Sequence, residues 1–272
     1  MQKSVGKVLL AAFLVLAISK PIASQADSGK SHGNEFRGLT TYFYRHSNPE
    51  LVPKIIEYLS SEAIKTRDRQ PPLIGLLSSI FRQYPGRVQT WVELAAGRTA
   101  KGIVAQALWY ADRQQDARNV LQSSGFSPKS VAWLEKQPAS PLRFKISNAD
   151  HLDILWGAFF GSGDIRYVQK IIGAVENANN NQHIVMEDVI FSARHVGRKH
   201  PRGRKIGEKY KSLGSAVIRD YIMGVTALWA LGSNSKQHEI VGQFIEAEYI
   251  KNPDDSVAIA LKRVAFGNAH PK

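Results

Sequence analysis

The chain has 272 residues, a formal net charge of +13 and no cysteine. Without cysteine it can form no disulfide scaffold, perform no thiol catalysis and bind no metal through thiolates, and it cannot be a lipoprotein acylated at a cleavage-site cysteine. The excess of basic residues favours anionic partners, such as acidic proteins, lipid headgroups, polysaccharides or nucleic acids.

The first 26 residues have the pattern of a cleavable secretory signal peptide. Lys3 and Lys7 give a basic start, and residues 8–18 form an unbroken apolar run of 11 residues. A helix needs about 20 such residues to cross a membrane, so this run is short for a membrane anchor. Small residues stand at the first and third places before a cut after Ala26, which suits signal peptidase. An uncleaved anchor or a buried helix is the alternative; we expect cleavage after Ala26.

Export of a chain of this size without cysteine is more typical of a bacterium than of a eukaryote, so we expect a periplasmic or secreted bacterial protein. Cleavage would remove Lys3, Lys7 and Lys20 and leave +10 of the +13 charges. Residues 27–35 are polar and contain glycine, which predicts a flexible N-terminus. No stretch after the signal peptide is long and apolar enough to span a membrane.

From residue 36 onward, apolar residues recur at helical spacing, without convincing strand-like alternation. We expect an N-terminal helical half at residues 36–137 and a C-terminal helical half at residues 151–272. Residues 138–150 contain two prolines and little periodicity, so they predict a joint between the halves. The alternative is that both halves form one domain.

Two helical hairpins match each other along the chain. Apolar stripes at 73–81 and 88–95 correspond to stripes at 152–160 and 168–175, with shifts of 79 and 80 residues. In the second hairpin a glycine-containing turn ends the first helix, and Asp164 is placed to cap the next one. The match suggests an internal repeat of helix–turn–helix units.

Residues 105–128 form a further hairpin. Ala107 and Ala117 provide a small residue in each helix, and Pro128 follows the second helix. In these features the segment resembles a tetratricopeptide repeat unit, although the family's tryptophan–leucine–glycine–tyrosine series is not cleanly present. The resemblance covers about 24 residues and implies a superhelix that binds proteins, with no catalytic residues.

Later apolar stripes at 218–229, 240–245 and 257–264 continue the helical pattern to the end of the chain. Successive hairpins with short turns predict an all-α fold of antiparallel helical hairpins, arranged as an α-solenoid or a similar repeat structure. The alternative is an irregular helical bundle.

The most unusual segment is strongly basic and covers residues 194–211. Gly197, Pro201 and Gly203 argue against a continuous helix through its middle, so we expect an exposed basic loop between helices. Such a loop could bind phosphate, carboxylate or sulfate groups in a salt-sensitive manner, or it could only keep the protein soluble. The candidate anion-binding residues are Arg194, Arg198, Lys199, Arg202, Arg204, Lys205, Lys209 and Lys211.

The sequence does not predict a metal site or a cofactor. His183 and Glu187 stand four residues apart, with His195 and His200 downstream, and imidazole and carboxylate groups can bind zinc. No H-E-x-x-H motif is present, however, and a His–Glu pair at this spacing is common on helix surfaces.

The sequence also identifies no catalytic residue. Helical peptidoglycan-cleaving enzymes use one glutamate as a general acid, whose pKa is raised by an apolar pocket. Glu57, Glu93 and Glu187 lie near apolar helical stretches, and Glu93 would be the first choice among them. No flanking motif marks any of the three, and a nucleophile-elbow motif of hydrolases is absent.

We therefore expect an exported, non-catalytic binding or scaffolding protein of the bacterial cell envelope, which uses a helical-repeat surface for protein–protein interaction. Its expected partner is another envelope protein or an anionic envelope component. We expect no nucleic-acid partner, because export removes the usual target and no recognition motif accompanies the charges. The alternatives are a helical peptidoglycan-cleaving glycosidase and a binder of anionic surfaces through residues 194–211.

Overall fold

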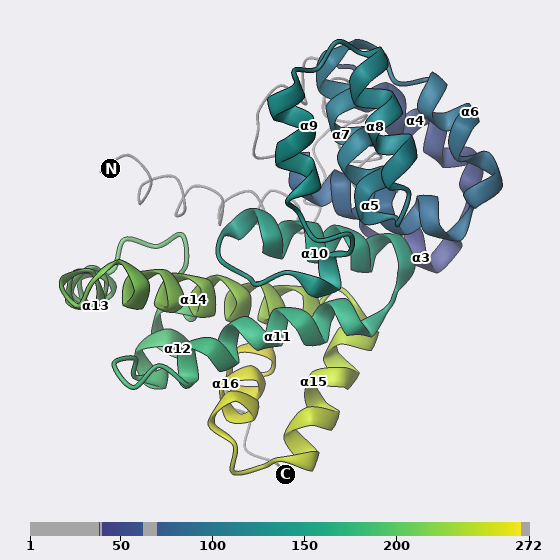
Figure 1. Ribbon diagram of the computed structural model, residues 1–272. Helices are drawn as coiled ribbons and strands as arrows, with labels where there is room; N and C mark the ends of the chain where they lie inside the picture. Colours follow the sequence, from purple (N-terminus) through teal and green to yellow (C-terminus); the bar gives the residue numbers. More distant parts are fainter. Residues whose placement is uncertain (1–37, 39, 62–69, 268–272) are drawn as a thin grey trace. The chain divides into compact units, whose positions relative to one another are not determined.

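The computed structural model describes residues 38, 40–61 and 70–267, and these ranges form fourteen α-helices, short 3-10 turns and no β-strand (Figure 1). The predicted all-α fold class is therefore confirmed for the described part of the chain. The predicted signal peptide at residues 1–26 and the predicted flexible segment at residues 27–35 lie outside the described residues. No helix within the described ranges is long and apolar enough to cross a membrane.

The described chain divides into two compact units. The N-terminal unit contains the described residues up to 145 together with residues 153–167, and the C-terminal unit contains residues 146–152 and 168–267. The chain therefore passes from one unit to the other three times, and the first passage lies within residues 138–150. Neither unit is a single continuous stretch of sequence.

Short helices joined by tight turns build the N-terminal unit. Helix α7 packs against α4, α5 and α8, and α8 in turn contacts α9. The core is made of side chains on the facing stripes of these helices, such as Ile80, Phe81 and Leu108, which are fully buried. The helices are α3 (Phe43–His46), α4 (Val52–Leu59), α5 (Gln70–Gln83), α6 (Val88–Glu93), α7 (Gly97–Tyr110), α8 (Gln114–Ser123), α9 (Pro128–Glu135) and most of α10 (Ala149–Ser162), with 3-10 turns at Pro49–Leu51, Pro85–Arg87 and Pro141–Arg143.

The hairpin predicted within residues 105–128 is present as α7 and α8. These helices pack against each other around a turn in which Asp112 has a φ of 67°, and Pro128 begins α9. A wider repeat arrangement is not confirmed. The second helices of the two matched hairpins differ, because α6 has 6 residues whereas its expected counterpart α11 (Ile165–Asn179) has 15.

Helices α5 and α10 cross with their backbones in contact. A Cβ atom on Gly75 of α5 would lie 1.9 Å from a carbonyl oxygen of α10, and one on Gly157 of α10 would lie 1.9 Å from a carbonyl oxygen of α5. The Ser79 hydroxyl donates a hydrogen bond of 2.9 Å to the carbonyl of Ala158 across this contact. Only glycine permits such an approach at either position.

The turn that follows α10 is built as the sequence predicts. Gly163 has a φ of 68°, and the Asp164 carboxylate accepts a hydrogen bond of 3.0 Å from the backbone N–H of Arg166. The predicted cap is therefore confirmed. The Arg166 side chain also donates to Asp164, and this hydrogen bond is the main reason that the pKa of Asp164 is lowered.

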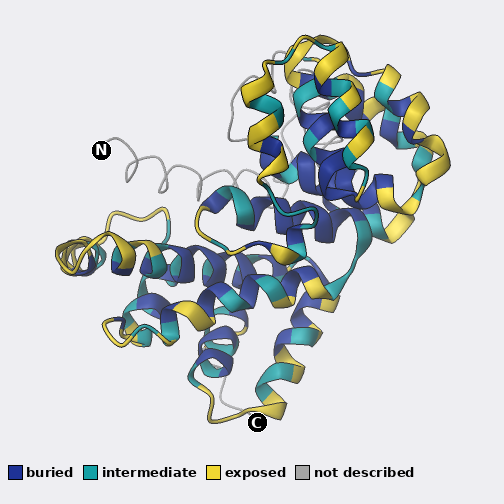
Figure 2. Cartoon of the chain, viewed as in Figure 1, coloured by how far each residue is buried: buried dark blue, intermediate teal, exposed yellow. Residues whose placement is uncertain are grey.

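The C-terminal unit is arranged around one long helix. Helix α14 packs against α12, α13, α15 and α16, and its Gly224 lies close to Ala178 of α11. Leu228 and Leu231 are fully buried, and Figure 2 shows how much of α14 is covered. The helices are α11 (Ile165–Asn179), α12 (Met186–Arg194), α13 (Pro201–Ser212), α14 (Ser215–Ser235), α15 (Glu239–Lys251) and α16 (Ser256–Ala265).

Candidate functional site

The basic segment at residues 194–211 is a loop only in part. Arg194 is the last residue of α12, residues 195–200 connect the helices, and α13 begins at Pro201. The prediction of one exposed loop was therefore wrong for its second part. At the first position of a helix the missing N–H of proline is not needed, and its fixed φ suits the helix.

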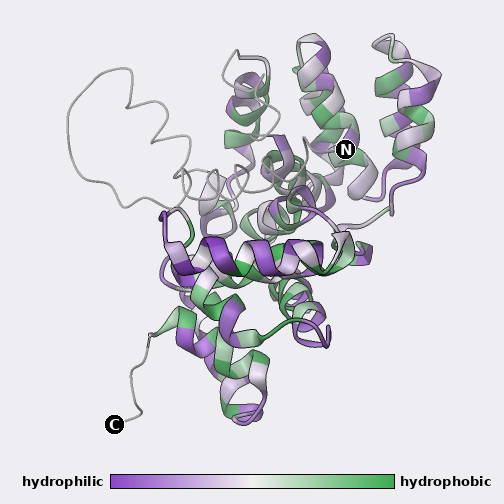
Figure 3. Cartoon of the chain, turned by 90° about the vertical axis from the view of Figure 1, so that its left-hand side faces the viewer, coloured by the Kyte–Doolittle hydropathy of each residue, from purple (hydrophilic) through white to green (hydrophobic). Residues whose placement is uncertain are grey.

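Helix α13 carries its basic residues on an outward face. Its N-terminus is capped by His200, whose Nδ1 accepts a hydrogen bond of 3.2 Å from the N–H of Arg202. Ile206 and Tyr210 stand four residues apart and are buried, which anchors one face of the helix to the unit. The helix lies at the left end of the C-terminal unit in Figure 1 and faces the viewer in Figure 3, where most of its length is hydrophilic.

A hollow of about 790 Å³ lies between residues 195–200, α13 and α14. We call it the basic hollow. Its floor is mainly apolar and is formed by Ile218, Ile222 and Val225, which follow one another at helical spacing on one face of α14. These three side chains are half-buried, so they are partly exposed to solvent within the hollow.

Four of the eight predicted anion-binding residues line this hollow. All four are exposed, and within the described part of the chain they form no ion pair with a carboxylate. Glu208 is the one carboxylate among the described lining residues, so the rim has a clear positive excess. The four residues are Arg198, Lys199, Arg204 and Lys211.

The structure does not bring the other four predicted residues to the hollow. Arg194 donates a hydrogen bond of 2.6 Å to the backbone carbonyl of Arg263, which ties α12 to α16. The Arg202 guanidinium lies over the ring of Phe191, 4.3 Å from its centroid. Lys209 binds a carboxylate, as described next, and Lys205 is exposed but does not line the hollow.

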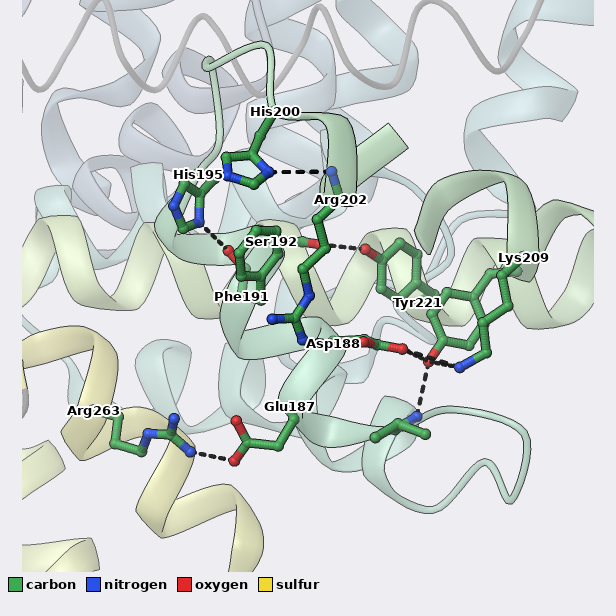
Figure 4. Close-up of polar contacts among 12 residues, drawn as sticks. Glu187, Asp188, Phe191, Ser192, His195, His200, Arg202, Lys209, Tyr221 and Arg263 are labelled. Atoms are coloured by element: carbon green, nitrogen blue, oxygen red, sulfur yellow. Dashed lines mark hydrogen bonds and ion pairs between the residues drawn. The ribbon is translucent and has the colours of Figure 1, made fainter. Parts of the chain in front are cut away.

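Asp188 joins α12 to α13 (Figure 4). Its carboxylate accepts hydrogen bonds from Lys209 Nζ at 3.0 Å and from the Tyr210 hydroxyl at 2.9 Å. The Tyr210 oxygen in turn accepts a hydrogen bond of 3.0 Å from the backbone N–H of Val185. The bond to Asp188 raises the pKa of Lys209, and burial is the main cause of the raised pKa of Tyr210.

Two tyrosines fix α14 beside this pair of helices. The rings of Tyr210 and Tyr221 stack with their centroids 4.3 Å apart, and the Tyr221 hydroxyl donates a hydrogen bond of 2.5 Å to the Ser192 oxygen. Burial raises the pKa of Tyr221 to about 12. Because these contacts hold α12, α13 and α14 together, the walls of the basic hollow are set by packed side chains. These contacts were not predictable from the sequence, since the partners lie far apart along the chain.

Two imidazoles lie at the edge of the hollow. The ring of His195 stacks on Phe191 with centroids 4.3 Å apart, and His195 and His200 lie 5.0 Å apart (Figure 4). The Nδ1 of His195 donates to the Phe191 carbonyl at 2.7 Å, which fixes the orientation of the ring. Both histidines therefore belong to an aromatic cluster with Phe191, in which His195 stacks on the phenyl ring and His200 meets it edge-on.

The metal site considered from the sequence does not form. Glu187 pairs with Arg263 of α16, and among the described residues no three histidine, aspartate or glutamate side chains are placed to hold a metal ion. His183, which stands four residues before Glu187, is exposed.

The glutamates considered as general acids lie in open positions. Glu57, Glu93 and Glu187 are all exposed. Glu93 accepts a hydrogen bond of 3.0 Å from Gln89 and lines a polar hollow of about 380 Å³ in the N-terminal unit. None of these three carboxylates lies in an apolar pocket of the kind that holds the general acid of such enzymes.

Comparisons with protein-family models, with curated proteins and with solved structures gave no significant match.

Proposed function

We propose that the chain is an exported, non-catalytic binding protein of the bacterial cell envelope, and that it binds an anionic ligand in the basic hollow. The observation that carries this proposal is a set of cations that form no ion pair with a carboxylate of the described residues and that surround a hollow walled by packed helices. Each cation can gain a charge-assisted hydrogen bond from a ligand without giving up an existing ion pair.

The shape of the site supports binding more than catalysis. Ligand sites are commonly hollows of about 300–1,000 Å³ with apolar walls and a few polar groups, and the basic hollow has about 790 Å³. The exposed positions of Glu57, Glu93 and Glu187 do not favour the alternative of a peptidoglycan-cleaving glycosidase. The hollows described on the hairpins of the N-terminal unit are smaller, at about 380 Å³ each.

The proposed site is tested by titrating the mature chain with inorganic phosphate while backbone amide signals are followed by nuclear magnetic resonance. We expect shifts confined to the residues that line the basic hollow. The shifts should weaken as salt is added, because screening reduces the attraction. Replacement of the four rim residues by glutamine should abolish them, in a variant that carries Arg198→Gln, Lys199→Gln, Arg204→Gln and Lys211→Gln.

A matched control removes the same positive charge elsewhere. Its four lysines are exposed and lie outside the basic hollow, and one of them is on α13 itself. This control should bind phosphate as the unmodified chain does; equal losses in both variants would contradict the proposed site. The control carries Lys54→Gln, Lys136→Gln, Lys205→Gln and Lys251→Gln.

The proposed export is tested separately by expressing the full chain in a bacterial host. We expect the periplasmic fraction to contain a protein that begins at Asp27, as measured by mass spectrometry of the intact chain. Full-length protein beginning at Met1 and confined to the cytoplasm would contradict the proposed export.

A further inference from the structure

We propose that the ligand of the basic hollow is an anionic amphiphile, a single molecule with a phosphate or carboxylate headgroup and a hydrocarbon tail that lies on the floor of α14. This inference rests on the proposed function and specifies its ligand. Its two parts are the charged rim and the apolar floor, which meet in one hollow.

The apolar floor is more than a simple anion requires. Ile218, Ile222 and Val225 are half-buried in the hollow, and Val196 and Tyr221 also line it. Covering partly exposed apolar side chains with a hydrocarbon tail is favourable, because it removes them from water. A hydrated ion such as free phosphate would leave this surface uncovered.

The cations lie alongside the apolar floor. Arg204 and Lys211 stand seven residues apart on α13, which places them on the same helix face about 10 Å from each other. Arg198 and Lys199 come from the loop before α13. A tail on the floor therefore has cations close to it, and a headgroup can bind two or more of them.

The size of the hollow favours one small molecule over a macromolecule. About 790 Å³ is in the range of sites that enclose a ligand of drug-like size. A flat polyanion or a bilayer surface could contact the exposed cations, but it could not fill the space above Ile222 and Val225. For this reason we assign the site to a monomeric amphiphile that enters the hollow.

The test is a calorimetric titration of the mature chain with inorganic phosphate and with ethyl, butyl, hexyl and octyl phosphate, each kept below its micelle concentration. We expect the affinity to rise by up to about fourfold for each methylene that becomes buried, until the floor is covered. The rim variant described above, which should no longer bind inorganic phosphate, should also bind each alkyl phosphate much more weakly than the unmodified chain does.

A second variant changes the floor alone. Ile222→Thr with Val225→Thr keeps a β-branched side chain at both half-buried positions and makes the floor more polar, so helix α14 should remain folded. This variant should bind inorganic phosphate normally and lose most of the gain with chain length. A matched control, Ile240→Thr with Ile250→Thr, changes two exposed isoleucines of α15 and should retain the full gain.

The outcomes separate the two proposals. Equal affinity across the series, with loss only in the rim variant, would overturn the amphiphile and leave the anion site intact. A gain with chain length that is the same in the floor variant and its control would also overturn the assignment. If neither phosphate nor any alkyl phosphate binds, the proposed function fails as well. Sedimentation with phosphatidylglycerol vesicles, in the absence of binding to monomeric alkyl phosphates, would indicate a membrane surface instead.

Discussion

Two glycines decide how closely α5 and α10 approach. A Cβ atom at Gly157 would lie 1.9 Å from the carbonyl oxygen of Pro72, and this backbone atom cannot move away as a flexible side chain could. We therefore expect Gly157→Ala to lower the free energy of unfolding by at least about 2 kcal/mol. Thermal unfolding followed by circular dichroism would measure the change.

The matched control for this substitution is Gly173→Ala in α11. A Cβ atom at Gly173 would meet only the Glu176 carboxylate, at 3.9 Å. Alanine should therefore stabilise this helix by about 0.5–1 kcal/mol, because it restricts the unfolded chain more than glycine does. If both substitutions changed the free energy of unfolding equally, the close approach of α5 and α10 at Gly157 would not be the reason for the loss.

Buried phenols predict a loss of stability at alkaline pH. Burial raises the pKa of Tyr110 from 10.0 to about 12. Since the unfolded chain releases this proton first, the contribution of Tyr110 to stability is complete below pH 10. It is lost as the pH rises toward 12, by about 2–3 kcal/mol at most.

The test is Tyr110→Phe, which should leave the free energy of unfolding at neutral pH nearly unchanged and reduce its loss at alkaline pH. Urea unfolding at several pH values would measure both. An equal alkaline loss in the unmodified chain and in Tyr110→Phe would contradict the contribution of Tyr110.

Single residues were predictable from the sequence where their role is local. The cap at Asp164 follows from a polar residue between a glycine turn and an apolar stripe, and the structure confirms it. The role of Asp188 was not predictable, because its partners Lys209 and Tyr210 lie more than 20 residues away. No local sequence pattern indicates a contact over such a separation.

At the scale of elements, helix positions followed from apolar periodicity, but one helix start was misread. The basic segment contains Pro201, and proline with nearby glycines indicated a loop. Whether a proline breaks a helix or begins one depends on the residues that follow. Here Ile206 and Tyr210 supply a buried face four residues apart, a signal short enough to be missed among so many charges.

The last helix offers a test of capping. The Asp255 carboxylate accepts a hydrogen bond of 2.8 Å from the N–H of Ala258 and so caps α16, which packs against α14. We expect Asp255→Ala to lower the free energy of unfolding by about 1 kcal/mol, measured by urea unfolding. Asp255→Asn should lose much less, since asparagine keeps a capping oxygen. Asp254→Ala, at an exposed neighbour without a capping bond, is the matched control, and an equal loss there would contradict the role of the cap.

For the whole molecule, the all-α class was predictable and the arrangement of the helices was not. Periodicity reports which face of a helix is apolar, but it does not report which helix covers that face. In the C-terminal unit α12 contacts not only α13 and α14 but also α16, which lies much further along the chain. A repeat in which each hairpin contacts only its neighbours would not bring α12 against α16. The same limit applies to the basic hollow, because Ile222 and Val225, which belong to the apolar stripe at residues 218–229, form its floor.

The three passages of the chain between the compact units make a prediction about fragments. Residues 153–167 belong to the N-terminal unit although they follow a stretch of the C-terminal unit. They include Gly157, Ala158 and the rest of the α10 face that packs against α5. A fragment that ends at residue 145 therefore lacks one wall of its core, whereas a fragment that ends at residue 167 keeps it.

Both fragments would begin at Asp27 and be heated while circular dichroism is recorded. We expect the longer fragment to unfold cooperatively and the shorter one to show a weak, gradual transition. Equally cooperative unfolding of both would mean that α5 is adequately covered without α10, and that the N-terminal unit is complete before residue 146.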